Sequence, residues 1–144
     1  DELFTEMAKY GMHTYIEMVK EASQGDGHAC DKLRRILEMH IDFVYNHMNI
    51  ARICMGLPRG LVPDGMKSFL FERKWEIFSI TKEVIVEGVA SGIFRNVDTS
   101  SAAMIFMGMI AQLYLHSVHG KQQSTPRNII EGMWDIFIAG IKAQ

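Results

Sequence analysis

The stretch from Asp98 to Val118 constrains the fold of this chain more than any other, because it is apolar on all sides of a helix. Between Ala102 and Leu115 the one clearly polar residue is Gln112. A helix without a polar face must be buried among several neighbours or lie in lipid. A bilayer span needs roughly 20 mainly apolar residues, and this run is shorter and is followed by His116 and His119. We therefore expect the innermost helix of a soluble assembly, and no membrane partner.

A helical wheel, which advances about 100° per residue, separates two sides of this stretch. The bulkier side suits a core or a cavity wall, and it carries Phe106, Ile110, Leu113 and Ser117. The opposite side includes small residues that allow another helix to approach closely, and it consists of Met104, Gly108, Ala111 and Leu115. One helix is thus expected to face two different partners.

Length and charge narrow the possible functions. At 144 residues the chain is long enough for one domain, covering 1–144, with a sizeable core. Its formal net charge is −2, with no basic block, so this chain by itself is not expected to bind nucleic acid. Cys30 and Cys54 have no CxxC or framework spacing, which favours the reducing cytoplasm and no disulfide. A start at Asp1 without a signal-peptide pattern is expected of a trimmed chain.

The rest of the chain also has helical spacing of its apolar residues, and no segment has the alternation of a strand. Glycine and proline mark the breaks, above all in the apolar connector 56–65. Asp98, Ser100 or Ser101 can cap the central helix, and Thr125 can cap the last one, with Pro126 in its first turn. We predict an all-α bundle of five helices, covering about 2–23, 29–55, 66–90, 98–119 and 126–143.

Two histidines lie on the apolar face of the predicted helix 29–55. His40 and His47 are seven residues apart, or about 10.5 Å at 1.5 Å rise per residue, so they cannot easily share one metal ion. Three interpretations stay open: hydrogen-bonded core histidines, polar groups in an apolar ligand cavity, or ligands of a metal completed from elsewhere.

Two further polar features also have alternative interpretations. Arg73 lies on an apolar stripe, where it could clamp a ligand carboxylate or phosphate or pair with a neighbouring glutamate. His116 and His119 could touch one ion, or could interact with the C-terminal dipole of their helix. The sequence has no nucleophile elbow, phosphate-binding glycine loop or HExxH motif. We therefore predict no enzyme, no catalytic residues, no cofactor and no committed metal site.

The last helix has a broad apolar face that includes Met133 and Phe137. Beside the wholly apolar central helix, this face exceeds what one small domain is expected to cover. Pairing both helices with their copies in a second subunit would give a four-helix interface. We predict a homodimer interface formed by Met104, Gly108, Ala111, Leu115, Met133 and Phe137.

The run Glu87-Gly88-Val89-Ala90-Ser91-Gly92-Ile93-Phe94-Arg95, followed by Asp98 and Ala102-Ala103 with Phe106 and Gly108, resembles the turn and penultimate helix of the tetracycline-repressor (TetR) family of bacterial transcription regulators. The ending Phe137-Ile138-Ala139-Gly140-Ile141 is similar to the last helix of that family. The resemblance implies an effector-binding and dimerisation domain whose last two helices form the dimer bundle. It also implies that DNA is contacted only through an N-terminal helix-turn-helix that is absent from this chain.

The resemblance further implies a site for a small, mostly apolar effector that allosterically alters DNA binding. We expect the effector to lie among Met7, Phe43, Ile77, Phe106 and Ile110, oriented by His40, His47 or Arg73. Two other functions remain open. One is a metal sensor or helical enzyme that uses His40, His47, His116 and His119, and the other is a helical module that binds a partner protein.

Overall fold

The computed structural model describes residues 2–54, 63–119 and 125–144, and these residues form helices connected by turns. Predictions about the connector 56–62, and about the side chains of Cys54 and His119, lie outside the described residues. The all-α prediction is confirmed. The helices within the described ranges are α1 Glu2–Gln24, α2 Ala29–Asn46, α3 Met48–Cys54, α4 Asp64–Ala90, α5 Thr99–His119 and α6 Arg127–Ile141.

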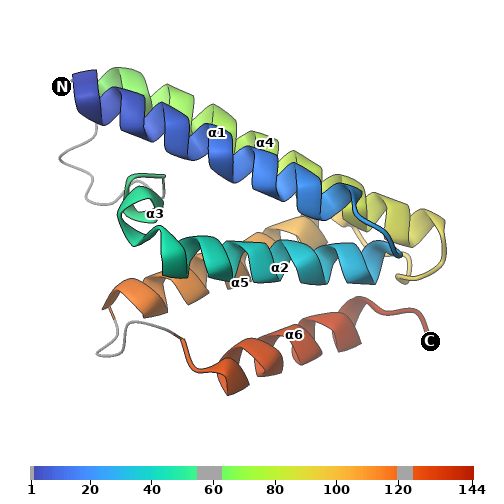
Figure 1. The fold of residues 1–144 in the computed structure, drawn as a ribbon. Coiled ribbons are helices and arrows are strands. Elements are labelled where there is room, and N and C mark those ends of the chain that lie inside the picture. The colour runs from blue at the N-terminus through green and yellow to red at the C-terminus, as the bar shows by residue number, and fades with distance from the viewer. Residues whose placement is uncertain (1, 55–62, 120–124) are drawn as a thin grey trace.

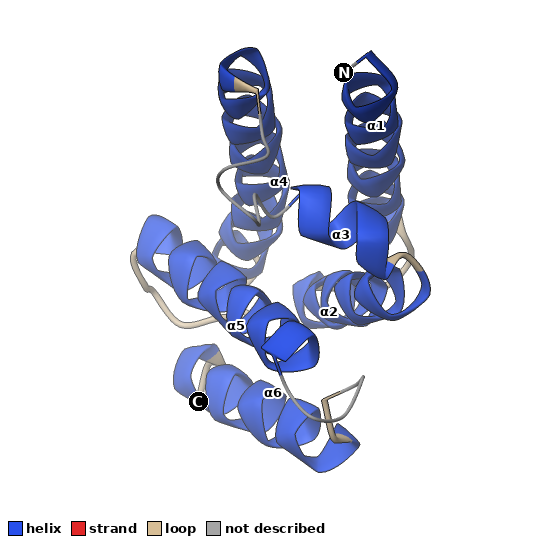
Figure 2. Ribbon diagram, turned by 90° about the vertical axis from the view of Figure 1, so that its left-hand side faces the viewer, coloured by secondary structure: helices blue, strands red, loops and turns tan. Residues whose placement is uncertain are grey.

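The helices form a layered bundle. The long helices α1 and α4 lie side by side, and α2 and α5 pack beneath them (Figures 1 and 2). Helix α6 packs against α5 on the side away from α1 and α4, as Figure 2 shows. Helix α5 therefore contacts α2, α4 and α6, as expected for the helix without a polar face. Within the described ranges, no helix combines the length and apolar character that a membrane crossing requires.

The prediction of a single helix over 29–55 is wrong at one point. The backbone of His47 leaves the helical region, with φ −133° and ψ 46°, so the chain forms α2 and then the short α3. His47 ends α2 by donating its N–H to the carbonyl of Phe43 at 2.8 Å, and its own carbonyl accepts from Ala51 at 2.8 Å. His47 is consequently exposed at a junction, not buried on an apolar stripe.

Two apolar clusters form the interior. One joins α2, the C-terminal part of α4, α5 and α6, and its buried members include Leu33, Leu37, Phe106, Ile110 and Phe137. The other joins α1, α2, α3 and α4 with one residue of α5, and includes Met12, Tyr15, Phe43, Ile77 and Tyr114. Helix α2 contributes to both clusters, so it connects the two sides of the domain.

The turn between α4 and α5 accounts for much of the family-like motif. A side chain at Gly88 would collide with the ring of Phe94 and lie 2.9 Å from the Cβ of Ala29. Gly92 follows the end of α4 with φ +79°, a conformation that glycine adopts without strain. Asp98 caps α5, because its carboxylate accepts the Ser101 N–H at 2.8 Å. These residues fix where α5 enters the bundle.

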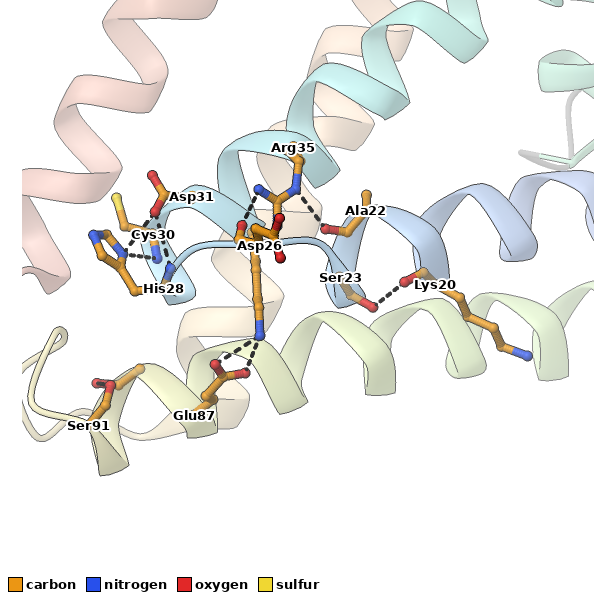
Figure 3. A network of polar contacts seen from close by, with 12 residues as sticks. Lys20, Ala22, Ser23, Asp26, His28, Cys30, Asp31, Arg35, Glu87 and Ser91 are labelled. Atoms are coloured by element: carbon orange, nitrogen blue, oxygen red, sulfur yellow. Dashed lines mark hydrogen bonds and ion pairs between the residues drawn. The ribbon is translucent and has the colours of Figure 1, made fainter.

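The turn between α1 and α2 is held by the polar contacts in Figure 3. The guanidinium of Arg35 donates to the carbonyls of Ala22 at 3.1 Å and Asp26 at 2.6 Å, so it closes the end of α1 against α2. The ammonium of Lys32 donates to both carboxylate oxygens of Glu87 on α4, at 2.9 and 3.0 Å. These contacts fix the N-terminal half of α2, the helix that supplies one wall of the site described next.

Candidate functional site

A mostly apolar cavity of about 50 Å³ lies between the C-terminal halves of α2 and α5 and the start of α6. Helix α2 provides one wall, helix α5 provides the opposite wall, and residues next to and within the first turn of α6 close the end. The lining residues are Leu37, His40, Ile41, Val44, Tyr45, Ile110, Leu113, Tyr114, Ser117, Thr125 and Ile130. The cavity is thus located where the two apolar clusters meet.

His40 is the polar residue of this lining that the protein buries most completely, with 1% of its surface exposed. Its Nδ1 is hydrogen-bonded to the hydroxyl of Tyr15 on α1, and the two rings meet edge to face with centroids 5.0 Å apart. Its Nε2 is buried and has no hydrogen-bond partner among the described residues. Burial lowers the pKa of His40 from 6.5 to about 3, so the ring is neutral at physiological pH.

Hydroxyl groups lie at the opposite end of the cavity. The Ser117 hydroxyl donates to the carbonyl of Leu113 at 3.0 Å and lies 3.1 Å from the hydroxyl of Thr125. The predicted role of Thr125 as helix cap is wrong: α6 begins at Arg127 after Pro126, without a side-chain cap. Thr125 instead turns back towards α5, because its hydroxyl hydrogen-bonds there to Ser117.

The structure places two of the predicted ligand residues, His40 and Ile110, on the cavity wall. Phe43 and Ile77 are buried in the cluster formed with α1, and Phe106 is buried in the cluster formed with α6. Of the five apolar residues of the predicted site, Ile110 belongs to the described lining of this cavity.

The other predicted ligand residues lie further from this cavity. Met7 is 44% exposed on α1, and His47 is exposed at the end of α2. Arg73 pairs with Glu76 at 3.4 Å and lies over the ring of Phe69 at 5.6 Å, so the neighbouring-glutamate interpretation describes it best.

Sequence reasoning missed most of the α2 wall. Leu37 and Val44 lie three residues before and four residues after His40 on the same helix face, so they could have been found by treating His40 as the centre of a site. Ile41 directly follows His40 and is not indicated by this spacing. The helical wheel groups Leu113 and Ser117 with Ile110, and all three residues line the cavity. The approach of Thr125 and Ile130 depends on the path of the chain between α5 and α6, which no local pattern specifies.

Exposed apolar side chains lie on both α5 and α6. The most exposed of them are Met104 on α5, 66% exposed, and Ile136 on α6, 78% exposed. Of the predicted dimer residues, Met104, Gly108 and Leu115 are exposed, Ala111 and Met133 are half-buried, and Phe137 is buried against Phe106 with ring centroids 5.4 Å apart. We call the surface formed by Met104, Ile105, Gly108, Leu115, Ile129, Met133 and Ile136 the outer face.

An ion-pair network connects the cavity wall to α6. Arg34 on α2 donates to Glu38 at 2.8 Å and to Glu131 on α6, and Arg127 donates to the same Glu38 at 2.7 Å. The hydrogen bonds from Arg34 hold the pKa of Glu131 below its ordinary value. Arg34 also lies over the Trp134 ring at 5.4 Å. Helix α6 is thus tied to α2 as well as packed on α5.

In the part of the chain that the structure describes, no group of three or more histidine, cysteine, aspartate or glutamate side chains could hold a metal ion. The alternative that combined His40, His47, His116 and His119 finds no common centre among the first three, since His40 is buried and His47 and His116 are exposed, while the side chain of His119 lies outside the described residues. In addition, the Nδ1 of His40 is already hydrogen-bonded to the hydroxyl of Tyr15.

Comparison with known families and structures identifies the arrangement. The family model described as Tetracyclin repressor-like, C-terminal domain, matches residues 26–141. No match was found among the curated proteins.

Several solved structures have the same fold. A bacterial regulatory protein in the tetR family from Rhodococcus RHA1 has a TM-score of 0.77 at 17% identity, with 100% of this chain and 75% of that chain covered. The ketosteroid transcriptional regulator KstR2 of Mycobacterium tuberculosis has a TM-score of 0.80 at 14% identity, covering 99% and 73%. AibR, solved in complex with isovaleryl coenzyme A and operator DNA, has a TM-score of 0.69 at 19% identity, covering 98% and 74%. At these identities the likeness concerns the fold alone.

Proposed function

Because this chain belongs to the family of tetracycline-repressor-like C-terminal domains, we propose that it binds a small, mostly apolar effector in the cavity between α2 and α5. The observation that carries the proposal is His40, a buried neutral ring with an unpartnered Nε2 in an otherwise largely apolar lining. Apolar walls with a few placed polar groups are typical of small-molecule sites. AibR, which shares the fold, was solved with isovaleryl coenzyme A.

The proposal includes a route by which occupancy alters DNA binding. Tyr15 connects His40 to α1, the helix nearest the N-terminus, and a ligand that moves His40 therefore also moves or releases α1. Such a ligand shifts the population of two domain arrangements if it binds one of them more tightly. The DNA itself would be contacted by a helix-turn-helix preceding α1, in the cytoplasm.

We also propose that the outer face joins two copies of the chain into a homodimer. Its support is the exposed apolar area on α5 and α6, since contiguous apolar patches on a protein surface commonly mark interaction sites. A second copy would place the two faces against each other in a four-helix arrangement.

A thermal-shift experiment with a cavity-filling variant tests the effector site. Small uncharged compounds such as phenol and toluene are suitable, and a bound one stabilises the wild type by about 2.7 kcal/mol at 100 times its dissociation constant. Val44→Phe adds a ring inside the cavity and should abolish that shift. Val86→Phe, the same substitution at an exposed site on α4, should retain it. Equal shifts for wild type and Val44→Phe would place the ligand elsewhere.

A further inference from the structure

The charge of the cavity lining restricts what can bind there. Among the described residues that line the cavity there is no lysine, arginine, aspartate or glutamate, and burial keeps the His40 ring neutral. An ionised ligand group would lose its hydration without gaining a charged partner, which is strongly unfavourable. The cavity therefore selects against carboxylates, phosphates and ammonium groups.

The polar groups of the lining differ in whether they already have a hydrogen-bond partner. Ser117 and Thr125 already hydrogen-bond to each other, and Ser117 also donates to the Leu113 carbonyl. At His40, Tyr15 occupies Nδ1 and is not part of the lining, which leaves Nε2 as the ring nitrogen without a partner among the described residues. A buried polar atom without a partner is costly, and a ligand that pairs with Nε2 removes this cost.

The tautomer of His40 determines which group can pair with Nε2. If the Tyr15 hydroxyl donates to Nδ1, then Nε2 carries the hydrogen and needs an acceptor; in the other tautomer Nε2 is itself an acceptor and needs a donor. A ketone satisfies the first case alone, whereas a hydroxyl group satisfies both. A hydroxyl is thus the uncharged group that fits His40 in either state.

The size of the cavity sets the remaining limit. Its volume of about 50 Å³ is well below the 150 Å³ or so of an engineered cavity that holds benzene. The exposed Tyr45 marks an open side of the lining, so part of a ligand can remain at the mouth. A compact molecule can place its polar end at His40 and its apolar body along Ile41, Val44 and Ile110.

We propose, building on the function proposed above, that the cavity binds a compact, uncharged hydroxyl compound, an alcohol or a phenol, whose hydroxyl pairs with Nε2 of His40. The apolar walls contact the body of the ligand, and the neutral imidazole of His40 hydrogen-bonds to its hydroxyl. Through Tyr15 the same imidazole connects the ligand to α1.

Three aromatic probes of similar size separate these requirements: phenol, toluene and benzoate, titrated at neutral pH against the wild-type chain. Chemical shifts of the Ile110 and Leu113 methyl groups report occupancy of the cavity, and the Nε2 nitrogen shift of His40 reports the hydrogen bond. Phenol should bind about tenfold more tightly than toluene, as one net hydrogen bond of about 1.4 kcal/mol gives. Benzoate should bind more weakly than either.

Substitution of the histidine tests the assignment directly. His40→Leu should reduce the preference for phenol over toluene from about tenfold to none. His13→Leu, the same substitution at an exposed site on α1, should leave the preference intact. If His40→Leu does not fold, the titrations of the wild type with phenol, toluene and benzoate still test whether the cavity prefers an uncharged hydroxyl compound.

The outcomes distinguish this inference from the function on which it rests. Equal binding of phenol and toluene, tighter binding of benzoate, or a preference that survives in His40→Leu would overturn the role of His40 while leaving the cavity as a ligand site. If none of the probes shifts the Ile110 and Leu113 signals, then both the inference and the proposed effector site are wrong.

Discussion

The inner side of α5 packs Ala103, Phe106 and Ile110 against the rest of the domain, whereas the outer side of the same helix exposes Met104 and Ile105 to solvent. The two sides are similarly apolar, but the inner side is buried within the domain and the outer side is exposed to solvent. Apolar content therefore identifies α5 as a helix that needs cover on all sides, but does not say which side is covered by its own chain. The inner side belongs to the folded unit, and the outer face is proposed to be completed by a second copy.

The largest expected effect comes from truncating the inner side. Phe106→Ala removes a ring with no exposed surface that contacts Phe137 on α6, and it should lower the free energy of unfolding by about 3–5 kcal/mol. Denaturant unfolding followed by tryptophan fluorescence, at one fixed protein concentration, measures this change. The matched control Phe71→Ala removes a ring that is 70% exposed on α4, and should change stability by less than about 1 kcal/mol. Similar losses for both variants would contradict the contrast between buried and exposed sites.

A charge on the outer face should act on association while leaving the fold intact. Met104→Glu would place an unpaired carboxylate in an apolar interface, and should weaken self-association about 100-fold, or by about 2.7 kcal/mol. Sedimentation equilibrium measures this change, and circular dichroism checks that the helices remain. Val86→Glu, at an exposed site on α4, is the control and should associate like the wild type. A wild-type chain that stays monomeric at high micromolar concentration would overturn the proposed face.

The sequence predicted the helices better than the site, and α5 shows why. Its helical wheel depends on spacing within one segment, so it correctly grouped Ile110, Leu113 and Ser117 on one side. The N-cap at Asp98 and the glycine at position 92 are also local signals, and both are present as expected. Predictions of this kind succeed because the physical cause lies within a few residues.

The site depends on how segments meet, which local spacing does not specify. The stripe through His40 and His47 assumed an unbroken helix, and the break at His47 placed one histidine inside and the other in solvent. Threonine is a residue type that often caps helices, but the hydroxyl of Thr125 hydrogen-bonds to the hydroxyl of Ser117 on α5 instead. Tertiary contacts between segments override local preferences at both positions.

The smallest of the expected effects, when it is expressed per pH unit, concerns the polar group that lies beside the inner side of α5. Burial lowers the pKa of His40 from 6.5 to about 3, so the folded chain binds this proton less readily than the unfolded chain does. Stability contributed by the neutral ring is complete above pH 6.5 and is lost as the pH falls towards 3. The free energy of unfolding should therefore decrease by about 1.4 kcal/mol for each pH unit in that interval.

Comparison with His40→Leu isolates this contribution. Carboxyl groups whose pKa is lowered in the folded chain, such as Asp98 and Glu131, lose their stabilisation below ordinary values of 3.8 and 4.5. Denaturant unfolding between those values and pH 6.5 therefore reports mainly on histidine. The other five histidines of the sequence remain in the variant, so the difference between the two slopes belongs to His40. Parallel slopes for wild type and His40→Leu would mean that the ring takes up its proton as easily in the folded chain as in the unfolded one, and that the cavity wall beside α5 is open to water.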